Sequence, residues 1–71
     1  MNNRTVVWEV VGNYIVSTVR PHDYDGFETM VFPQEDGEVT SWQDLYCRRY
    51  KTVDSARVGH REIVACIEAV S

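Results

Sequence analysis

The sequence predicts an α+β domain in which a small curved antiparallel sheet of three to four strands packs against one C-terminal helix. Residues 53–69 are the only stretch with a sustained helical period, because their apolar or small side chains recur at spacings of three and four. The stretches before it are short, rich in β-branched and aromatic residues, and separated by glycine, proline and aspartate. We therefore expect residues 1–71 to form a single domain in which the strands cover the helix.

The first two strands are expected at residues 5–11 and 14–20, and they form a hairpin. The Gly12-Asn13 pair between them is typical of a two-residue turn of the primed type. Neither face of this hairpin is cleanly polar. Such a hairpin either lies at the centre of the sheet or keeps a surface for another chain.

Two further strands are expected at residues 27–32 and 45–50. Pro33 should end the first of them, and an acidic, solvated turn centred on Gly37 should follow. The second should lie at a sheet edge, because the charges of Arg48 and Arg49 discourage edge pairing.

The segment 39–44 between these strands is ambiguous. Ser41 is placed to cap a single helical turn, and Trp42 is placed to anchor it to the core.

Thr52 is the expected N-cap of the C-terminal helix, with Asp54 in the first turn, where the helix dipole favours an anion. One face of this helix carries Ala56, Gly59, His60, Ile63, Ile67 and Val70. A glycine inside a helix costs about 1 kcal/mol relative to alanine, so something is expected to approach the backbone at Gly59. The aromatic candidates are Phe27, Trp42 and Tyr50.

Several strings of the sequence resemble a family of short, mostly functionally unassigned proteins of phages and prophages. They are STV at 17–19, the loop 22–26, FETMVF at 27–32, and R-Y-x-T-x3-A-x2-G-H from Arg49 to His60, followed by Ile63-Val64. The similarity covers roughly residues 14–64. It implies a phage origin and a small accessory role. It carries no enzymatic activity over to this chain. Because residues 1–14 lack the apolar core and cleavage site of a signal peptide, we expect a location in the host cytoplasm.

Composition excludes several classes of protein. The content of 44% hydrophobic residues is too high for a disordered chain, and no run approaches the roughly 18 apolar residues of a membrane span. Residues 1–44 have a net charge of −6 and residues 45–71 a net charge of +2. This polarity favours self-association or a charged partner, but it lacks the basic balance of a nucleic-acid binder. We therefore expect no membrane association and no nucleic-acid partner.

His60 has two interpretations. In the first it is a structural histidine that bonds a strand carbonyl or Glu28. In the second it contacts a ligand or acts in catalysis, since histidine titrates near neutral pH. The sequence shows no base and orienting group beside it, so we expect no catalytic constellation and no enzyme.

Metal and cysteine chemistry find little support in the spacing. His22, His60, Cys47 and Cys66 are zinc-ligand types, but they form no C-x2-C or H-x3-H pattern. The cysteines are expected to pack as small buried hydrophobes. No phosphate-binding glycine loop is present, and we expect no cofactor.

The best candidate binding residues are basic. Arg48, Arg49 and Lys51, with Arg57 and Arg61 on the following helix, form a cluster suited to a phosphate or nucleotide. The alternative is a charge match with the acidic first part of the chain or with another subunit, which needs no ligand.

Our first hypothesis is a phage accessory protein that acts by non-enzymatic binding to a bacterial host protein, in host takeover or anti-defence, with a homodimer left open. The alternative is an anion- or nucleotide-binding protein that sequesters a phosphorylated signalling ligand. The ligand- or partner-binding candidates are Arg48, Arg49, Lys51, Arg57, Arg61 and His60.

Overall fold

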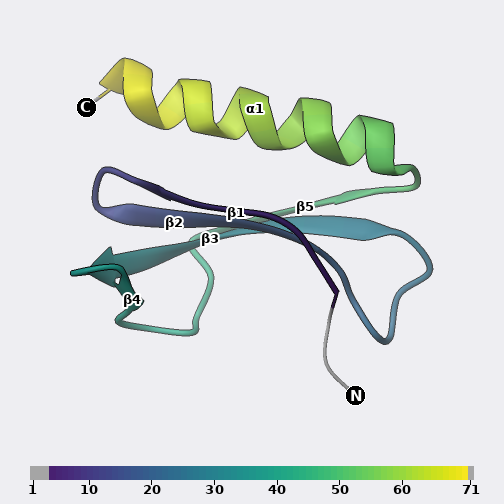
Figure 1. Ribbon diagram of the computed structural model, residues 1–71, viewed down its shortest axis with the longest axis horizontal. Coiled ribbons are helices and arrows are strands. Elements are labelled where there is room, and N and C mark those ends of the chain that lie inside the picture. The colour runs from purple at the N-terminus through teal and green to yellow at the C-terminus, as the bar shows by residue number, and fades with distance from the viewer. Residues whose placement is uncertain (1–3, 71) are drawn as a thin grey trace.

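The computed structural model describes residues 4–70 and confirms the α+β architecture (Figure 1). Its elements are β1 (Arg4–Val11), β2 (Tyr14–Arg20), β3 (Phe27–Glu35), β4 (Glu38–Val39), β5 (Tyr46–Tyr50) and α1 (Val53–Val70). All pairings are antiparallel: β2 lies between β1 and β3, and β5 pairs with the other side of β3. The short β4 pairs with the end of β3. Within the described chain, β1 and β5 are thus the edge strands of the main sheet.

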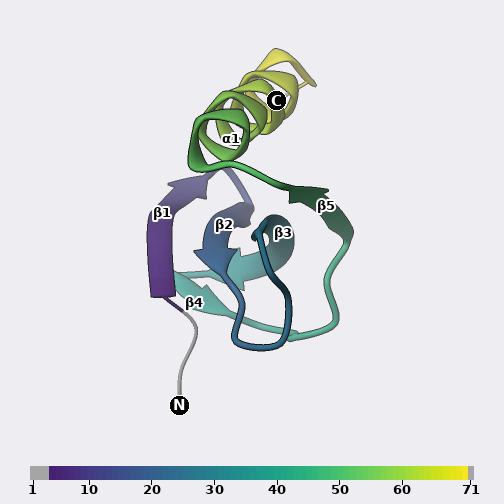
Figure 2. The same cartoon turned by 90° about the vertical axis from the view of Figure 1, so that its right-hand side faces the viewer.

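The sheet curls into a trough, and α1 lies along its open side. Figure 2 shows β1 and β5 on the two flanks, with the helix above and between them. The helix contacts all four main strands. This arrangement makes the concave face of the sheet the surface that covers the apolar stripe of α1.

The core beneath α1 is small. Its buried apolar members are Val11, Val16, Val31 and Ile63. The other face of the sheet also buries apolar side chains, such as those of Ile15 and Phe32. Residues 15–19 of β2 are all buried, because β2 is an inner strand of the sheet, between β1 and β3. Its partner β1 is mostly exposed.

The expected cap and the close approach to Gly59 are both confirmed. The backbone N–H of Ser55 donates to Oγ1 of Thr52 at 3.1 Å. The aromatic ring against Gly59 is that of Tyr50. The apolar stripe of α1 is buried up to Ile63. Val70 at its end is 86% exposed, because the last turn of the helix extends beyond the sheet.

The expected end of the third strand at Pro33 is wrong, since β3 continues to Glu35. The N–H of Gln34 donates to the carbonyl of Asn13 on the β2 side. By the alternation of an antiparallel ladder, the nitrogen of Pro33 points to the other side, where β5 no longer runs. On that side the carbonyl of Pro33 accepts from the N–H of Thr40 at 3.0 Å, and β3 continues without a return bond from the proline.

Two expectations for side chains are also wrong. The segment 39–44 forms no helical turn, and Trp42 is 71% exposed, lying edge-on against Phe32 with ring centroids 5.2 Å apart. Cys47 and Cys66 are exposed rather than buried. The turn at Gly37 is confirmed as a solvated link, with Asp36 and Gly37 both at positive φ. Among residues 4–70, no helix has the length and apolarity needed to cross a bilayer.

Candidate functional site

A chain of polar side chains runs through the core from β1 to β3, with His60 of α1 in the middle. Nε2 of His60 lies 2.7 Å from Oε1 of Glu9, and Nδ1 lies 2.6 Å from Oγ1 of Thr18. Oγ1 of Thr18 lies 2.5 Å from Oγ1 of Thr29. One helical residue is thereby bonded to β1 and β2 directly and to β3 through a hydroxyl.

The geometry determines which group donates and which accepts at each hydrogen bond of this network. A carboxylate oxygen only accepts, so the proton in the contact with Glu9 lies on Nε2 of His60. In the neutral imidazole Nδ1 is then an acceptor, and the Thr18 hydroxyl donates to it. Because the single proton of Thr18 is used there, the hydroxyl of Thr29 donates to Thr18. Every member of the network has a partner in this arrangement.

The connectivity resembles that of a hydroxyl–imidazole–carboxylate triad, but the hydroxyl is sealed. Thr18 is 0% exposed and His60 is 2% exposed, so no substrate reaches the Thr18 oxygen in this conformation. A nucleophile needs access to the atom it attacks. The arrangement therefore acts as a polar connection between helix and sheet, and it satisfies an otherwise costly buried imidazole.

His60 lies in the core, but neither of its expected partners, a strand carbonyl or Glu28, is the one that it contacts. Glu28 does not reach His60, because it lies on the opposite face of the sheet and pairs with Arg49 at 3.2 Å. The actual partners are 51 and 42 residues away in the sequence, on the first two strands.

The basic residues do not converge on one point. The side chains of Arg48 and Arg49 lie on opposite faces of β5, as alternation requires. Arg48 pairs with Glu62 of α1 at 3.1 Å, and Arg49 pairs with Glu28. Hydrogen bonds to these carboxylates raise the pKa of both guanidinium groups, so both arginines stay positively charged. Arg48 also lies over the ring of Tyr50, and Arg49 over that of Tyr24.

The remaining candidates are exposed and lie elsewhere. Lys51 follows β5, and with 3.6 residues per turn Arg57 and Arg61 share the flank of α1 opposite to the one that carries Glu62 and Cys66. Within residues 4–70, Lys51, Arg57 and Arg61 form no ion pair. The structure thus divides the predicted cluster among three surfaces.

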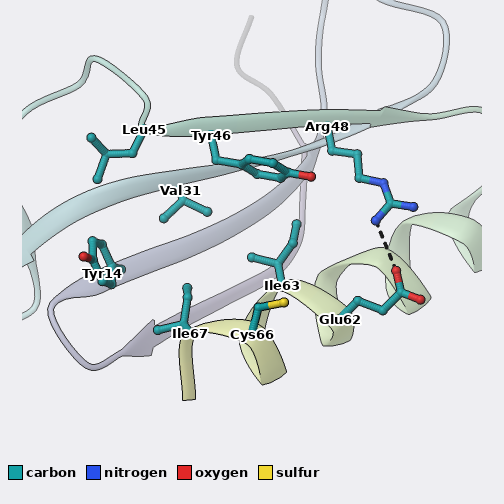
Figure 3. A pocket seen from close by; sticks show the side chains of 9 residues that line it. All are labelled: Tyr14, Val31, Leu45, Tyr46, Arg48, Glu62, Ile63, Cys66 and Ile67. Atoms are coloured by element: carbon teal, nitrogen blue, oxygen red, sulfur yellow. Dashed lines mark hydrogen bonds and ion pairs between the residues drawn. The ribbon is translucent and has the colours of Figure 1, made fainter. Parts of the chain in front are cut away.

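A groove of about 600 Å³ opens between β5 and the C-terminal half of α1 (Figure 3). The sheet contributes Tyr14, Val31, Leu45, Tyr46 and Arg48, and the helix contributes Glu62, Ile63, Cys66 and Ile67. Figure 3 shows the apolar side chains of the two elements facing one another, with the Arg48–Glu62 pair closing one end. The lining is mainly apolar, and Leu45 at its mouth is 60% exposed.

The groove runs beside a strand whose outer edge is unpaired. Within the described residues β5 pairs only with β3, which leaves its other row of N–H and C=O groups without a strand partner. An edge strand beside a helix-lined apolar groove is the arrangement in which extended peptides add to a sheet. The sequence did not reveal this groove, because its lining comes from four separate segments. The only local signal is the apolar Leu45-Tyr46 pair at the start of a short charged strand.

Metal binding receives no support from the described residues. Between residues 4 and 70, no three His, Cys, Asp or Glu side chains gather closely enough to hold an ion. Comparisons of the chain with protein-family models, with curated proteins and with solved structures find no match.

Proposed function

We propose that the chain is a non-enzymatic binding protein that captures an extended segment of a partner protein along β5, in the groove beneath α1. The observation that carries this proposal is the apolar groove of about 600 Å³ next to the unpaired edge of β5. Added strands gain main-chain hydrogen bonds from the edge, while alternate side chains enter the groove and give selectivity.

The surface along β5 defines the chemistry of the partner. At one end lie the apolar Leu45 and Tyr46, and at the other end lie the basic Arg48, Arg49 and Lys51. A complementary strand has apolar side chains opposite the first end and carboxylates opposite the second. Arg48 and Arg49 are already oriented by their own carboxylates, so they select among partner strands rather than repel all of them.

The sequence resemblance supports a bacterial host protein as this partner, in host takeover or anti-defence. The mainly apolar lining suits the side chains of an extended protein segment better than the phosphates of a nucleotide. The lining contains one guanidinium, and that group is paired with Glu62.

The proposal is tested by selecting binders from a displayed library of random peptides of roughly ten residues, the length of a long strand. Selected sequences should alternate apolar residues and end in carboxylates. Labelled peptide should shift the backbone amide signals of residues 46–50. Cys66→Arg, which fills the groove, should weaken binding at least about tenfold, a cost of about 1.4 kcal/mol. Val58→Asp, an exposed position on the same helix outside the groove, is the matched control and should bind like the wild type.

Two results would contradict the proposal. One is a set of peptides that bind Cys66→Arg and wild type equally. The other is the release of a phosphorylated metabolite when the purified protein is denatured by heat, with loss of that metabolite in Arg57→Ala plus Arg61→Ala. The second result would favour the anion-sequestering alternative. With the groove established, capture from bacterial lysate by wild type but not by Cys66→Arg would identify the host protein.

A further inference from the structure

The edge strand β1 is exposed in a different way from β5. Trp8 and Val10 are 46% and 52% exposed on the face away from α1, and the outer backbone edge of β1 has no strand partner within the described chain. Its charged residues are Arg4 and Glu9. By contrast, β5 carries adjacent arginines that discourage unselective pairing. β1 has no such pair and no proline.

The two charges of β1 are both incompletely compensated. Arg4 lies directly opposite Arg20 in the β1–β2 register, which is a like-charge pair, and it forms no ion pair within residues 4–70. Arg20 itself reaches Asp25 at 3.8 Å. Glu9 uses Oε1 for His60, while its side chain remains 47% exposed. A negatively charged group near Arg4 and a positively charged group near Glu9 would each provide the missing opposite charge.

An irregularity in β1 places these charges on one face. In a regular strand, residues five positions apart point to opposite faces. The register of β1 shifts between Thr5 and Val7, so Arg4 pairs with Arg20 and Glu9 with Val16. Arg20 and Val16 are four residues apart on β2, so they share a face. That face is the α1 side, because Val16 belongs to the core cluster with Ile63 of α1. Arg4 and Glu9 therefore both lie on the α1 side of the sheet.

We propose that β1 is the interface of a homodimer, in which β1 of a second copy pairs antiparallel with it about a two-fold axis between Val6 and Val7. In this register Arg4 of each copy lies opposite Glu9 of the partner subunit. The two copies form one continuous sheet with both helices on the same side. Glu9 then connects His60 of its own chain with Arg4 of the partner subunit. This interface is separate from the groove at β5 and does not depend on the function proposed for it.

The two-fold symmetry makes a sharp test, because each charge pair occurs twice. Arg4→Glu creates two like-charge pairs in its own dimer, and Glu9→Lys does the same with the opposite sign. A mixture of the two variants forms a heterodimer in which both cross-strand pairs have opposite signs. Analytical ultracentrifugation over a concentration series measures each dissociation constant. We expect a wild-type dimer, about tenfold or more weaker association for each single variant, and recovery in the mixture.

Lys51→Glu is the matched control, since it reverses an exposed positive charge beyond the other edge of the sheet. It should leave the dissociation constant unchanged. Glu9→Lys disturbs the contact with His60, so its folding is checked by circular dichroism. If it does not fold, Arg4→Glu alone still decides, because Arg4 is exposed and lies outside that network.

A wild-type chain that stays monomeric at millimolar concentration would overturn the proposal. So would a dimer that Arg4→Glu leaves intact, which would place the interface elsewhere. The register has its own test in a chain carrying Cys47→Ser and Cys66→Ser. In that background, Thr5→Cys plus Trp8→Cys should form intermolecular disulfides, whereas either cysteine alone should not, because no residue faces itself about this axis. A disulfide-linked dimer of a single variant would exclude the register.

Discussion

The ring of Tyr50 lies directly against the backbone of α1 at Gly59, leaving no room for a β-carbon at position 59. The contact joins the last residue of β5 to the middle of the helix, one position before His60. It therefore sets how closely the helix approaches the sheet at the point where Glu9 and Thr18 must reach the imidazole.

Gly59→Ala should destabilise the protein despite the better helix propensity of alanine. The propensity gain is about 1 kcal/mol, whereas an added methyl group forced against a buried ring costs up to about 3 kcal/mol. We expect a net loss of roughly 1–2 kcal/mol in urea denaturation. Val58→Ala, at the exposed neighbouring position, should change stability by less than about 0.5 kcal/mol. In a Tyr50→Ala background the sign should reverse, and an equal loss there would show that the ring is not the obstacle.

Tyr50→Phe should be neutral or stabilising. The hydroxyl of Tyr50 is buried and has no hydrogen-bond partner within residues 4–70. Burying such a group costs about 1–3 kcal/mol when no bond compensates it. Thermal unfolding of the variant should therefore occur at the wild-type temperature or above it. A fall in stability by more than about 1 kcal/mol would reveal a hydrogen bond from this hydroxyl.

The tautomer of His60 is expected to carry its proton on Nε2. The contact with the Glu9 carboxylate requires a donor there, and the Thr18 hydroxyl then donates to Nδ1. Long-range ¹H–¹⁵N correlation spectra distinguish the two ring nitrogens directly. In the neutral imidazole we expect a protonated Nε2 and an unprotonated Nδ1. The reverse pattern would mean that Glu9 does not accept from His60.

Thr18→Val should destabilise the fold by about 1–3 kcal/mol, because it keeps the shape of the side chain but leaves Nδ1 of His60 and the Thr29 hydroxyl unpaired in the core. Thr40→Val, at an exposed position, is the control and should be within about 0.5 kcal/mol of the wild type. Chemical denaturation measures both. Equal effects of the two substitutions would indicate that water replaces the missing hydroxyl.

The thiol of Cys47 should react slowly with iodoacetamide near pH 8. Although Cys47 is exposed as a residue, partial desolvation of its thiol raises the thiol pKa, and the negative charges of Glu28 and Asp44 raise it further, against a smaller opposing effect of Arg49. A raised pKa lowers the thiolate fraction at any pH below it, and the thiolate is the reacting form. In a Cys66→Ser chain, the rate should reach its half-maximum at a higher pH than that of a free cysteine peptide. Asp44→Asn should move this midpoint to lower pH, and an unchanged midpoint would count against the charge effect.

Local chemistry made much of the fold predictable. The hairpin turn at Gly12, the cap at Thr52 and the apolar stripe of α1 depend on neighbours within a few residues. Such interactions can be inferred from spacing alone. The failures at Pro33 and Trp42 arose because their outcome depends on which strand is still present beside them, and this is a property of the sheet rather than of the segment.

The candidate sites divide in the same way. The sequence by itself determined that His60 lies on the buried stripe next to a glycine, that Arg48 and Arg49 stand on a short strand, and that β-rich segments precede one helix. Only the tertiary structure decided that His60 reaches Glu9 and Thr18, that the basic residues separate onto different surfaces, and that an apolar groove opens beside β5. The physical reason is that periodicity fixes the face on which a side chain lies. Its partners are fixed by strand order, register and curl, which arise from contacts between residues far apart in the chain.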